Sequence, residues 1–188
     1  MNLTIYPVTL ERWDDLEKLF GTRGACGGCW CMWWRSSRAE FEAKKGEKNR
    51  QALKRLVQSG PSPGLIGYLD GQPVGWICVG PRQDFVRLAT SRVLAPVDDQ
   101  PVWSAVCFFV AKAQRRSGLA ASLLKAAVKH AQEQGATIIE GYPVRAYAPK
   151  MPDAFAYVGL ETIFSQAGFK IAIRRGKGRA VWRRTLNP

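Results

Sequence analysis

The sequence predicts an α+β fold: a single domain over residues 1–188, in which one mixed, mostly antiparallel sheet of about seven strands is flanked by about four helices. The length is close to the roughly 150 residues of a typical domain. Apolar residues alternate in some segments, as in strands, and recur every three or four positions in others, as in helices. No internal repeat or long linker divides the sequence, so these elements should share one core.

The first third of the chain predicts a strand and two helices. Residues 2–8 predict the strand. Ser37 and Glu40 have the capping-box spacing that opens the second helix, which Gly46 interrupts and which should stop at residues 59–61. The first helix is predicted by apolar residues at helical spacing before Gly21: Trp13, Leu16, Leu19 and Phe20.

The middle of the chain predicts the centre of the sheet. Residues 65–80 read as a hairpin that turns at Asp70 and Gly71, a pair that tolerates positive φ angles. Residues 81–101 read as an excursion with one short helix. Residues 102–111 are almost all apolar, which predicts a central strand that is buried on both faces.

The last third predicts a helix, a strand, a helix and a hairpin. Residues 117–134 form an alanine-rich amphipathic helix that Gly135 stops, and residues 137–144 form the next strand. Residues 153–168 read as a helix despite Gly159. Residues 169–186 read as a hairpin that turns at residues 176–178.

The charge and composition of the chain indicate which classes of partner it could bind and in which compartment it would work. Lys and Arg number 28 against 15 Asp and Glu, and this net charge of +13 favours polyanions such as nucleic acid or a polyphosphate cofactor. No apolar run reaches the roughly 18 residues of a membrane span, and no basic, apolar leader opens the sequence. We therefore expect a cytoplasmic protein without membrane association, whose five cysteines are reduced.

Residues 107–127 carry the most informative local pattern. A buried strand runs through a short basic loop into a helix whose first residues are small. Free backbone N–H groups at a helix start, beside a glycine, form a cradle for an anion such as a pyrophosphate. An ordinary strand-to-helix turn with solvated arginines is the alternative.

Two motifs make the chain resemble a known family. Arg115-x-x-Gly118-x-Ala120 is similar to the (Q/R)-x-x-G-x-(G/A) acetyl-CoA signature of the GNAT superfamily of N-acetyltransferases. The predicted order of elements matches that fold, and FSQAGFK, residues 164–170, resembles its Y-x-x-x-G-F segment. GCWCMWWR and EGYPV resemble a bacterial branch of the superfamily.

The resemblance implies that acetyl-CoA is the acyl donor and that a primary amine of a small molecule or protein is the acceptor. The backbone of Phe109 or Val110, Val110 above all, would meet the pantetheine arm, between the separating strands of Cys107 and Ile139. The pyrophosphate would be bound by backbone N–H groups of Arg115, Arg116, Ser117, Gly118, Leu119 and Ala120.

The catalytic residues depart from the family pattern. Residues 102–110 lack the usual glutamate base, so Glu140 on the next strand is the nearest substitute; a structural carboxylate paired with arginine is the alternative. The usual tyrosine acid is replaced by Phe164, which leaves Tyr157 as the candidate among Tyr142, Tyr147 and Tyr157. Cys107 as an acyl-carrying nucleophile is a weaker alternative, because a Cys in an apolar strand is usually inert.

The segment CGGCWCMWWR allows three interpretations. Cys26, Cys29 and Cys31 fall short of the four ligands of a zinc site, and the glycines between Cys26 and Cys29 argue against a redox pair, so we expect no metal. Trp30, Trp33 and Trp34 are candidates to line the acceptor pocket, although core packing is the alternative.

A different class of function is a degenerate module that binds nucleic acid through its basic surface. The basic terminal hairpin and the basic second helix would contact RNA or DNA. As a separate matter, a homodimer remains an open alternative for the chain. The hairpin cations are Arg174, Arg175, Lys177, Arg179, Arg183 and Arg184, and the second helix adds Lys44, Lys45, Lys48, Arg50, Lys54 and Arg55.

Overall fold

Seven strands of the described chain form one mixed sheet in the order β1-β2-β3-β4-β5-β7-β6. The structure is a computed structural model that describes residues 2–146 and 156–186. Only β4 and β5 pair in parallel, which confirms the predicted α+β class. The strands are β1 Leu3–Pro7, β2 Gly64–Leu69, β3 Gln72–Pro81, β4 Trp103–Val110, β5 Ile138–Gly141, β6 Lys170–Arg174 and β7 Ala180–Thr185.

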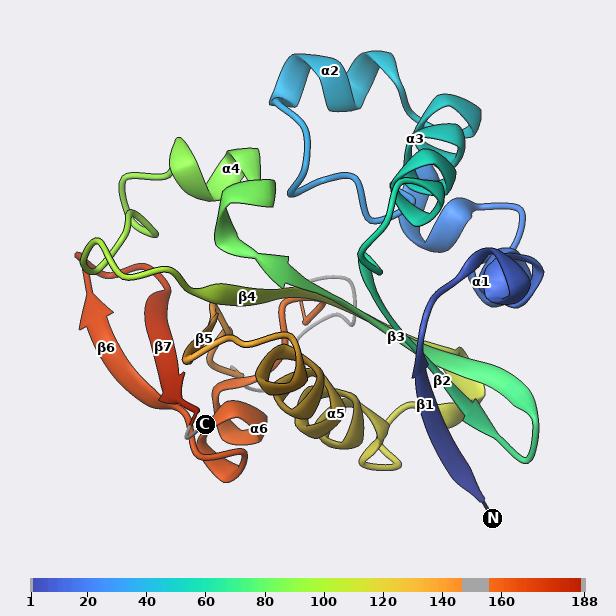
Figure 1. Ribbon diagram of the computed structural model, residues 1–188. Helices are drawn as coiled ribbons and strands as arrows, with labels where there is room; N and C mark the ends of the chain where they lie inside the picture. The colour runs from blue at the N-terminus through green and yellow to red at the C-terminus, as the bar shows by residue number, and fades with distance from the viewer. Residues whose placement is uncertain (1, 147–155, 187–188) are drawn as a thin grey trace.

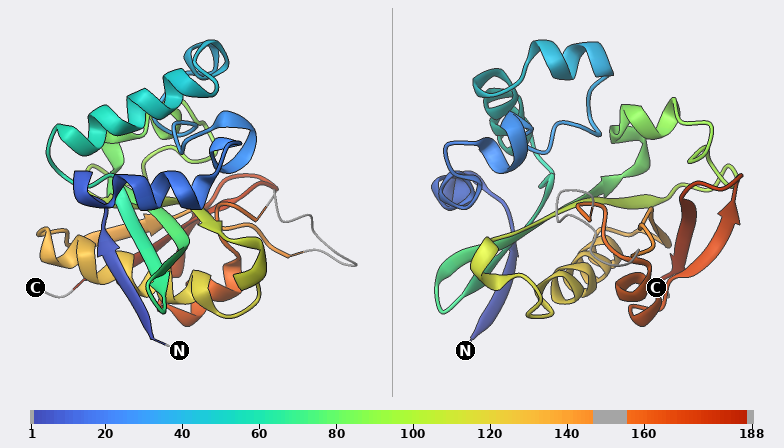
Figure 2. Two further views of the ribbon diagram at one scale, coloured as in Figure 1. Left: turned by 90° about the vertical axis from the view of Figure 1, so that its right-hand side faces the viewer. Right: turned by 180° about the vertical axis from the view of Figure 1, so that it is seen from behind.

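Helices cover both faces of the sheet (Figures 1 and 2). One face carries α1 Trp13–Phe20, α2 Arg38–Ala43, α3 Glu47–Gln58 and α4 Val86–Ala89. The other carries α5 Leu119–Glu133 and α6 Glu161–Gln166. Each face therefore has its own core, centred on Trp76 beneath α1 and on Leu123 and Ala127 of α5.

Local sequence signals set several boundaries. Ser37 and Glu40 make both hydrogen bonds of the capping box at the start of α2. Gly46, with φ at +78°, separates α2 from α3, so the expected second helix is two helices. Asp70 and Gly71 both have positive φ angles and close the β2–β3 hairpin as predicted.

The prediction of one helix over residues 153–168 is wrong for residues 156–160, which are not helical. Residues 153–155 lie outside the described chain, and α6 begins only at Glu161. Gly159 has φ at +86°, and its C=O accepts a bond from the N–H of Val144 while Glu161 N–H returns one to Val144. This bridge holds Leu160 in an extended conformation and, with the positive φ of Gly159, keeps the helix from starting before Glu161.

The parallel strands β4 and β5 stay paired for only three residues. Trp103, Ser104 and Ala105 face Ile139, Glu140 and Gly141, where β5 ends, whereas β4 continues to Val110. Val106, at the point of separation, has no partner on β3 because the register shifts there. The second half of β4 therefore presents an edge that no strand of the described chain covers.

None of the described helices is long and apolar enough to cross a membrane.

Candidate active site

The free edge of β4 exposes backbone polar groups at alternate residues. Ala111 N–H donates to Val74 C=O at 2.9 Å, on the β3 side, and Phe108 N–H donates to Tyr157 C=O at 2.6 Å, on the other side. Because the direction alternates along a strand, the N–H and C=O of Val110 point to the free edge and those of Phe109 point to β3. Of the two predicted contacts for the pantetheine arm, Val110 is the one with its backbone at this edge. The side chain of Phe109 contacts Phe20.

A run of unpaired backbone donors follows β4. Among the described residues, the N–H groups of residues 116–120 donate no hydrogen bond, although those of Gln114 and Arg115 before them and Ala121 after them do. The run ends in the first turn of α5, where the helix dipole adds positive potential. All five donors belong to residues predicted to bind a pyrophosphate.

Backbone conformation and two side chains shape this loop. Arg116 and Gly118 have φ angles of +66° and +84°, and a Cβ on Gly118 would meet nothing within 4 Å. Ser117 Oγ donates to Gln114 C=O at 2.7 Å, and Arg115 Nε donates to Val110 C=O at 3.3 Å. These two side-chain hydrogen bonds hold the loop to the end of β4, and the space next to Gly118 is open in the described structure.

Glu140 lies at the parallel pairing of β4 and β5, fully buried. Arg183 Nε donates to its Oε1 at 2.7 Å, and Arg82 Nη1 donates to its Oε2 at 2.9 Å. Tyr142 OH donates to Oε2 at 2.8 Å. Both oxygens are therefore already hydrogen-bonded, which is the arrangement of the alternative interpretation, a structural carboxylate paired with arginine.

Tyr142 belongs to the same network. Its OH lies 2.8 Å from Ser104 Oγ and 2.7 Å from Arg82 Nη1. Burial, followed by the charge of Glu140, raises the pKa of Tyr142. The phenol stays protonated and serves as a donor to Glu140 rather than as an exposed acid.

Tyr157 also lies near Trp34, with 6.5 Å between the ring centroids, and is only half-buried. Burial raises its pKa, more than the neighbouring Arg179 and Trp33 lower it. Its hydroxyl is therefore protonated at neutral pH and can donate a proton. Tyr147, the third tyrosine considered, lies outside the described residues. Phe164 is fully buried, so the position that it takes from the family tyrosine is a core position here.

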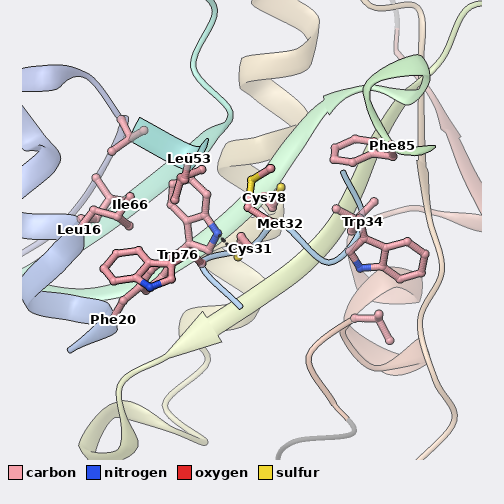
Figure 3. Close-up of a cluster of buried hydrophobic side chains, with 14 of the residues drawn as sticks. Leu16, Phe20, Cys31, Met32, Trp34, Leu53, Ile66, Trp76, Cys78 and Phe85 are labelled. Atoms are coloured by element: carbon pink, nitrogen blue, oxygen red, sulfur yellow. Dashed lines mark hydrogen bonds between the residues drawn. The ribbon is translucent and has the colours of Figure 1, made fainter. Parts of the chain in front are cut away.

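The cysteines form no cluster of three with other metal-ligating side chains in the described part of the chain. Cys31 Sγ lies 3.6 Å from Cys107 Sγ and accepts a hydrogen bond from Trp76 Nε1 at 2.9 Å (Figure 3). Cys26 is exposed and Cys29 is half-buried; burial raises the pKa of Cys29 to about 11. Contact with Cys31 lowers the pKa of Cys107, but burial and the nearby thiols of Cys29, Cys78 and Cys26 together raise it, so the net shift of the Cys107 pKa is upward.

The three candidate tryptophans are divided between core and site. Trp30 is buried against Trp13 and Phe20, beneath α1, so its side chain is not placed to line an acceptor pocket. Trp34 is also buried, but its ring lies 6.4 Å from that of Tyr142 and 6.5 Å from that of Tyr157, and Figure 3 shows it at the opposite end of the buried cluster from Trp76.

Trp33 is half-buried and stacks with Arg87, whose guanidinium carbon lies 3.5 Å from the ring centroid.

The basic hairpin is mostly engaged within the molecule. Arg174 pairs with Glu161, and Arg183 pairs with Glu140 and Asp98. Arg175 donates to the C=O groups of Ala95 and Pro96, and Arg184 donates to that of Ala167. These bonds leave the hairpin with fewer free cations than the sequence suggested, which weakens the nucleic-acid alternative.

Four arginines near the candidate site residues were not singled out from the sequence: Arg82, Arg87, Arg179 and Arg183. Arg179 and Arg183 were considered only as part of a basic hairpin, and nothing in the sequence around Arg82 or Arg87 marks either residue. Arg82 reaches Glu140 across 58 residues of chain. Only the fold reveals such a pairing.

Comparison with solved structures agrees on the fold. The PaiA N-acetyltransferase from Thermoplasma acidophilum, solved in complex with coenzyme A, is 15% identical, with a TM-score of 0.56 over 99% of this chain and 100% of that chain. The arylalkylamine N-acetyltransferase 2 from Aedes aegypti is 12% identical, with a TM-score of 0.61 over 100% of both chains.

A GNAT family acetyltransferase from Brucella melitensis, in complex with acetyl-CoA, is 14% identical, with a TM-score of 0.52 over 100% of this chain and 90% of that chain. A search of curated proteins finds no match. The family model described as acetyltransferase (GNAT) family matches residues 30–146, which is more than half of the chain and includes β4, the amide run and β5. This chain belongs to the GNAT family of acetyltransferases.

Proposed function

We propose that this protein transfers the acetyl group of acetyl-CoA directly to a primary amine. The observation that carries the proposal is the run of five unpaired amides, residues 116–120, at the end of a strand whose edge is free. Family membership supports acyl transfer, and two structural neighbours were solved with coenzyme A or acetyl-CoA.

The chain offers a distinct group for each part of this cosubstrate. The amides of residues 116–120 would bind the pyrophosphate, since unpaired backbone donors at a helix start suit an anion. The N–H of Val110 would bind an amide C=O of the pantetheine arm, as a neighbouring strand would. Acetyl-CoA itself supplies the thioester.

In the transfer step, a neutral amine forms a bond to the acetyl carbon as the bond from carbon to sulfur breaks. The proton of the amine leaves to water, and the sulfur of CoA takes a proton from a donor. Tyr157 is our candidate donor, because its raised pKa keeps it protonated and it lies beside β4. The tyrosine then regains a proton from solvent.

Glu140 remains the nearest carboxylate to the separating strands, and we propose that it acts as a positioning residue. Two arginines and Tyr142 occupy its oxygens, so it holds β5 and β7 in place beside β4. A positioning residue lowers turnover when it is changed but leaves the pH dependence of turnover unaltered. If Glu140→Gln removed a limb from the pH profile of kcat/KM, Glu140 would be the base instead.

The experiment that tests the proposed function is calorimetric titration with acetyl-CoA, with Gly118→Glu and Gly176→Glu as a matched pair. Both glycines have positive φ angles, and a Cβ on either meets nothing within 4 Å, so both variants carry similar backbone strain and charge. Only Gly118 adjoins the amide run. We expect binding in the parent and in Gly176→Glu, and none in folded Gly118→Glu. Equal binding by both variants would contradict this site.

A further inference from the structure

Three buried N–H groups near Tyr157 have no hydrogen-bond partner in the described chain. They are Nε and Nη2 of Arg87 and Nε1 of Trp34. Buried donors are almost always paired, because burial removes the water that would otherwise accept their bonds. Trp34 is only 4% exposed, so solvent does not replace the missing partner.

The two side chains that carry these donors belong to one cluster. The guanidinium of Arg87 stacks on Trp33, and the backbone N–H of Arg87 donates to Trp34 C=O at 3.2 Å. Arg179 approaches Trp34 from β6–β7, with its guanidinium carbon 5.7 Å from the ring centroid. Neither Arg87 nor Arg179 forms an ion pair with a described carboxylate. Arg179 and Trp33 are hydrogen-bonded to the hydroxyl of Tyr157. The cluster therefore carries positive charge, and three N–H groups of Arg87 and Trp34 lack an acceptor in the described chain.

This cluster borders the place assigned to acetyl transfer. Tyr157 lies beside Trp34 and interacts electrostatically with both Arg87 and Arg179. Its C=O accepts a hydrogen bond from the N–H of Phe108 on β4. Burial lowers the pKa of Arg87, a cost that an anion bound beside the guanidinium would offset. The side chains that carry the unmatched donors thus lie next to Tyr157, the proposed proton donor.

We propose that the amine acceptor carries a carboxylate, which Arg87 and Trp34 bind while Arg179 adds positive charge. The assignment rests on the proposed acetyl transfer and names its substrate class. A carboxylate supplies two acceptor oxygens and one negative charge, which is what the donors lack. An acceptor with a second amine would place a cation against the two arginines, which is unfavourable.

Binding is the first test, and it does not depend on turnover. The probes are 3-phenylpropionate, its neutral twin 3-phenyl-1-propanol, and 2-phenylethyl phosphate, followed by tryptophan fluorescence in the full chain. We expect the carboxylate to bind at least about tenfold more tightly than the alcohol, as a charged hydrogen bond predicts. Equal affinity of acid and alcohol would overturn the proposal, and tighter binding of the phosphate would replace the carboxylate with a phosphate.

Arg87→Gln and Arg92→Gln form the matched variant pair. Arg92 is an exposed arginine in the same connection between β3 and β4. We expect Arg87→Gln to lose the preference for 3-phenylpropionate over the alcohol and Arg92→Gln to keep it. Loss of the preference in both variants would mean that net charge alone attracts the probe, which would overturn the site.

The second test measures acetyl transfer to amino acids and to the amines that they would give on loss of the carboxylate: phenylalanine with 2-phenylethylamine, and leucine with 3-methylbutylamine. We expect kcat/KM to favour the carboxylated member of a pair, and Arg87→Gln to remove that preference through KM. Transfer to plain amines without preference overturns this inference alone. If acetyl-CoA binds but no acceptor is acetylated, the proposed function fails while the binding test still decides the carboxylate site.

Discussion

Arg183 on β7 joins Glu140 on β5 through a hydrogen bond of 2.7 Å from Nε to Oε1. The other side of the same guanidinium binds Asp98, in the connection that leads into β4. Arg82, at the end of β3, binds the second oxygen of Glu140. The buried carboxylate therefore links β3, β5, β7 and the connection before β4, just where β4 and β5 begin to separate.

Removing this carboxylate should destabilise the fold. Glu140→Leu leaves two partly buried guanidiniums without their shared anion, so we expect a loss of about 3–5 kcal/mol in the free energy of unfolding. Glu140→Gln keeps the shape and an acceptor oxygen and should lose less. Urea unfolding measures both. Glu133→Gln, which removes an exposed pair with Lys129, is the control and should change stability by less than about 1 kcal/mol.

An effect of Glu140→Leu as small as that of Glu133→Gln would show that the network contributes little.

The single histidine gives the stability a pH dependence with a defined sign. His130 on α5 contacts Trp103 edge-on, and burial lowers its pKa below the usual value. As the pH falls, the unfolded chain takes the proton first, at about pH 6.5, so folding loses stability through that pH and on through the lowered pKa of the folded state. The melting temperature should therefore fall from about pH 7.5 to about pH 5.5.

His130→Gln should remove most of this dependence, since no other histidine is present. Thermal unfolding at several pH values, with and without the substitution, measures it. A melting temperature that responds equally to pH in both proteins would assign the dependence to other groups.

The parts of the fold that the sequence predicted are those coded within a few residues. Ser37 and Glu40 cap a helix by bonds between neighbours, and Asp70 and Gly71 close a turn by their own backbone preferences. The apolar run of β4 marks a central strand because both of its faces are covered. The amide run was found for the same reason, because strand, loop, glycine and helix are consecutive.

What was missed depends on contacts between distant segments. The bridge between Val144 and Leu160 converts part of an expected helix into extended chain. The two arginine partners of Glu140 lie 58 and 43 residues away, so the sequence alone left its role open. The stacking of Arg87 on Trp33 is equally nonlocal. The sequence shows where aromatic residues are but not which of them are buried. Trp30 and Trp33 differ only in what the fold places around them.

Gly141, at the end of β5, should not tolerate a side chain. A Cβ there would lie 1.9 Å from Cε1 of Phe164, and that ring is held against Phe108 and Phe169. We expect Gly141→Ala to lose about 1–3 kcal/mol of unfolding free energy, the usual range for overpacking. Gly178→Ala, in the β6–β7 turn with only a valine methyl nearby, is the control.

The double variant Gly141→Ala with Phe164→Leu should be less destabilised than the sum of the two single changes, because the smaller side chain admits the methyl group. Strict additivity in urea unfolding would show that the contact with Phe164 is not the cause.

Cys107 should be dispensable for acetyl transfer. It lies on β4 beside the free edge, where an acyl-enzyme would form if the reaction passed through one. The contact with Cys31 lowers its pKa, but burial and the neighbouring thiols together raise it further, so the thiol rather than the reactive thiolate prevails at neutral pH. We expect Cys107→Ala to keep kcat within about threefold of the parent, since direct transfer uses no side-chain nucleophile.

Cys78→Ala, which removes the buried thiol opposite Cys107 on β3, controls for the loss of packing. The intact mass of the parent, taken after incubation with acetyl-CoA alone, should show no added acetyl group. An acetylated protein together with an inactive Cys107→Ala would replace direct transfer with a two-step mechanism, in which Cys107 carries the acetyl group before the amine takes it.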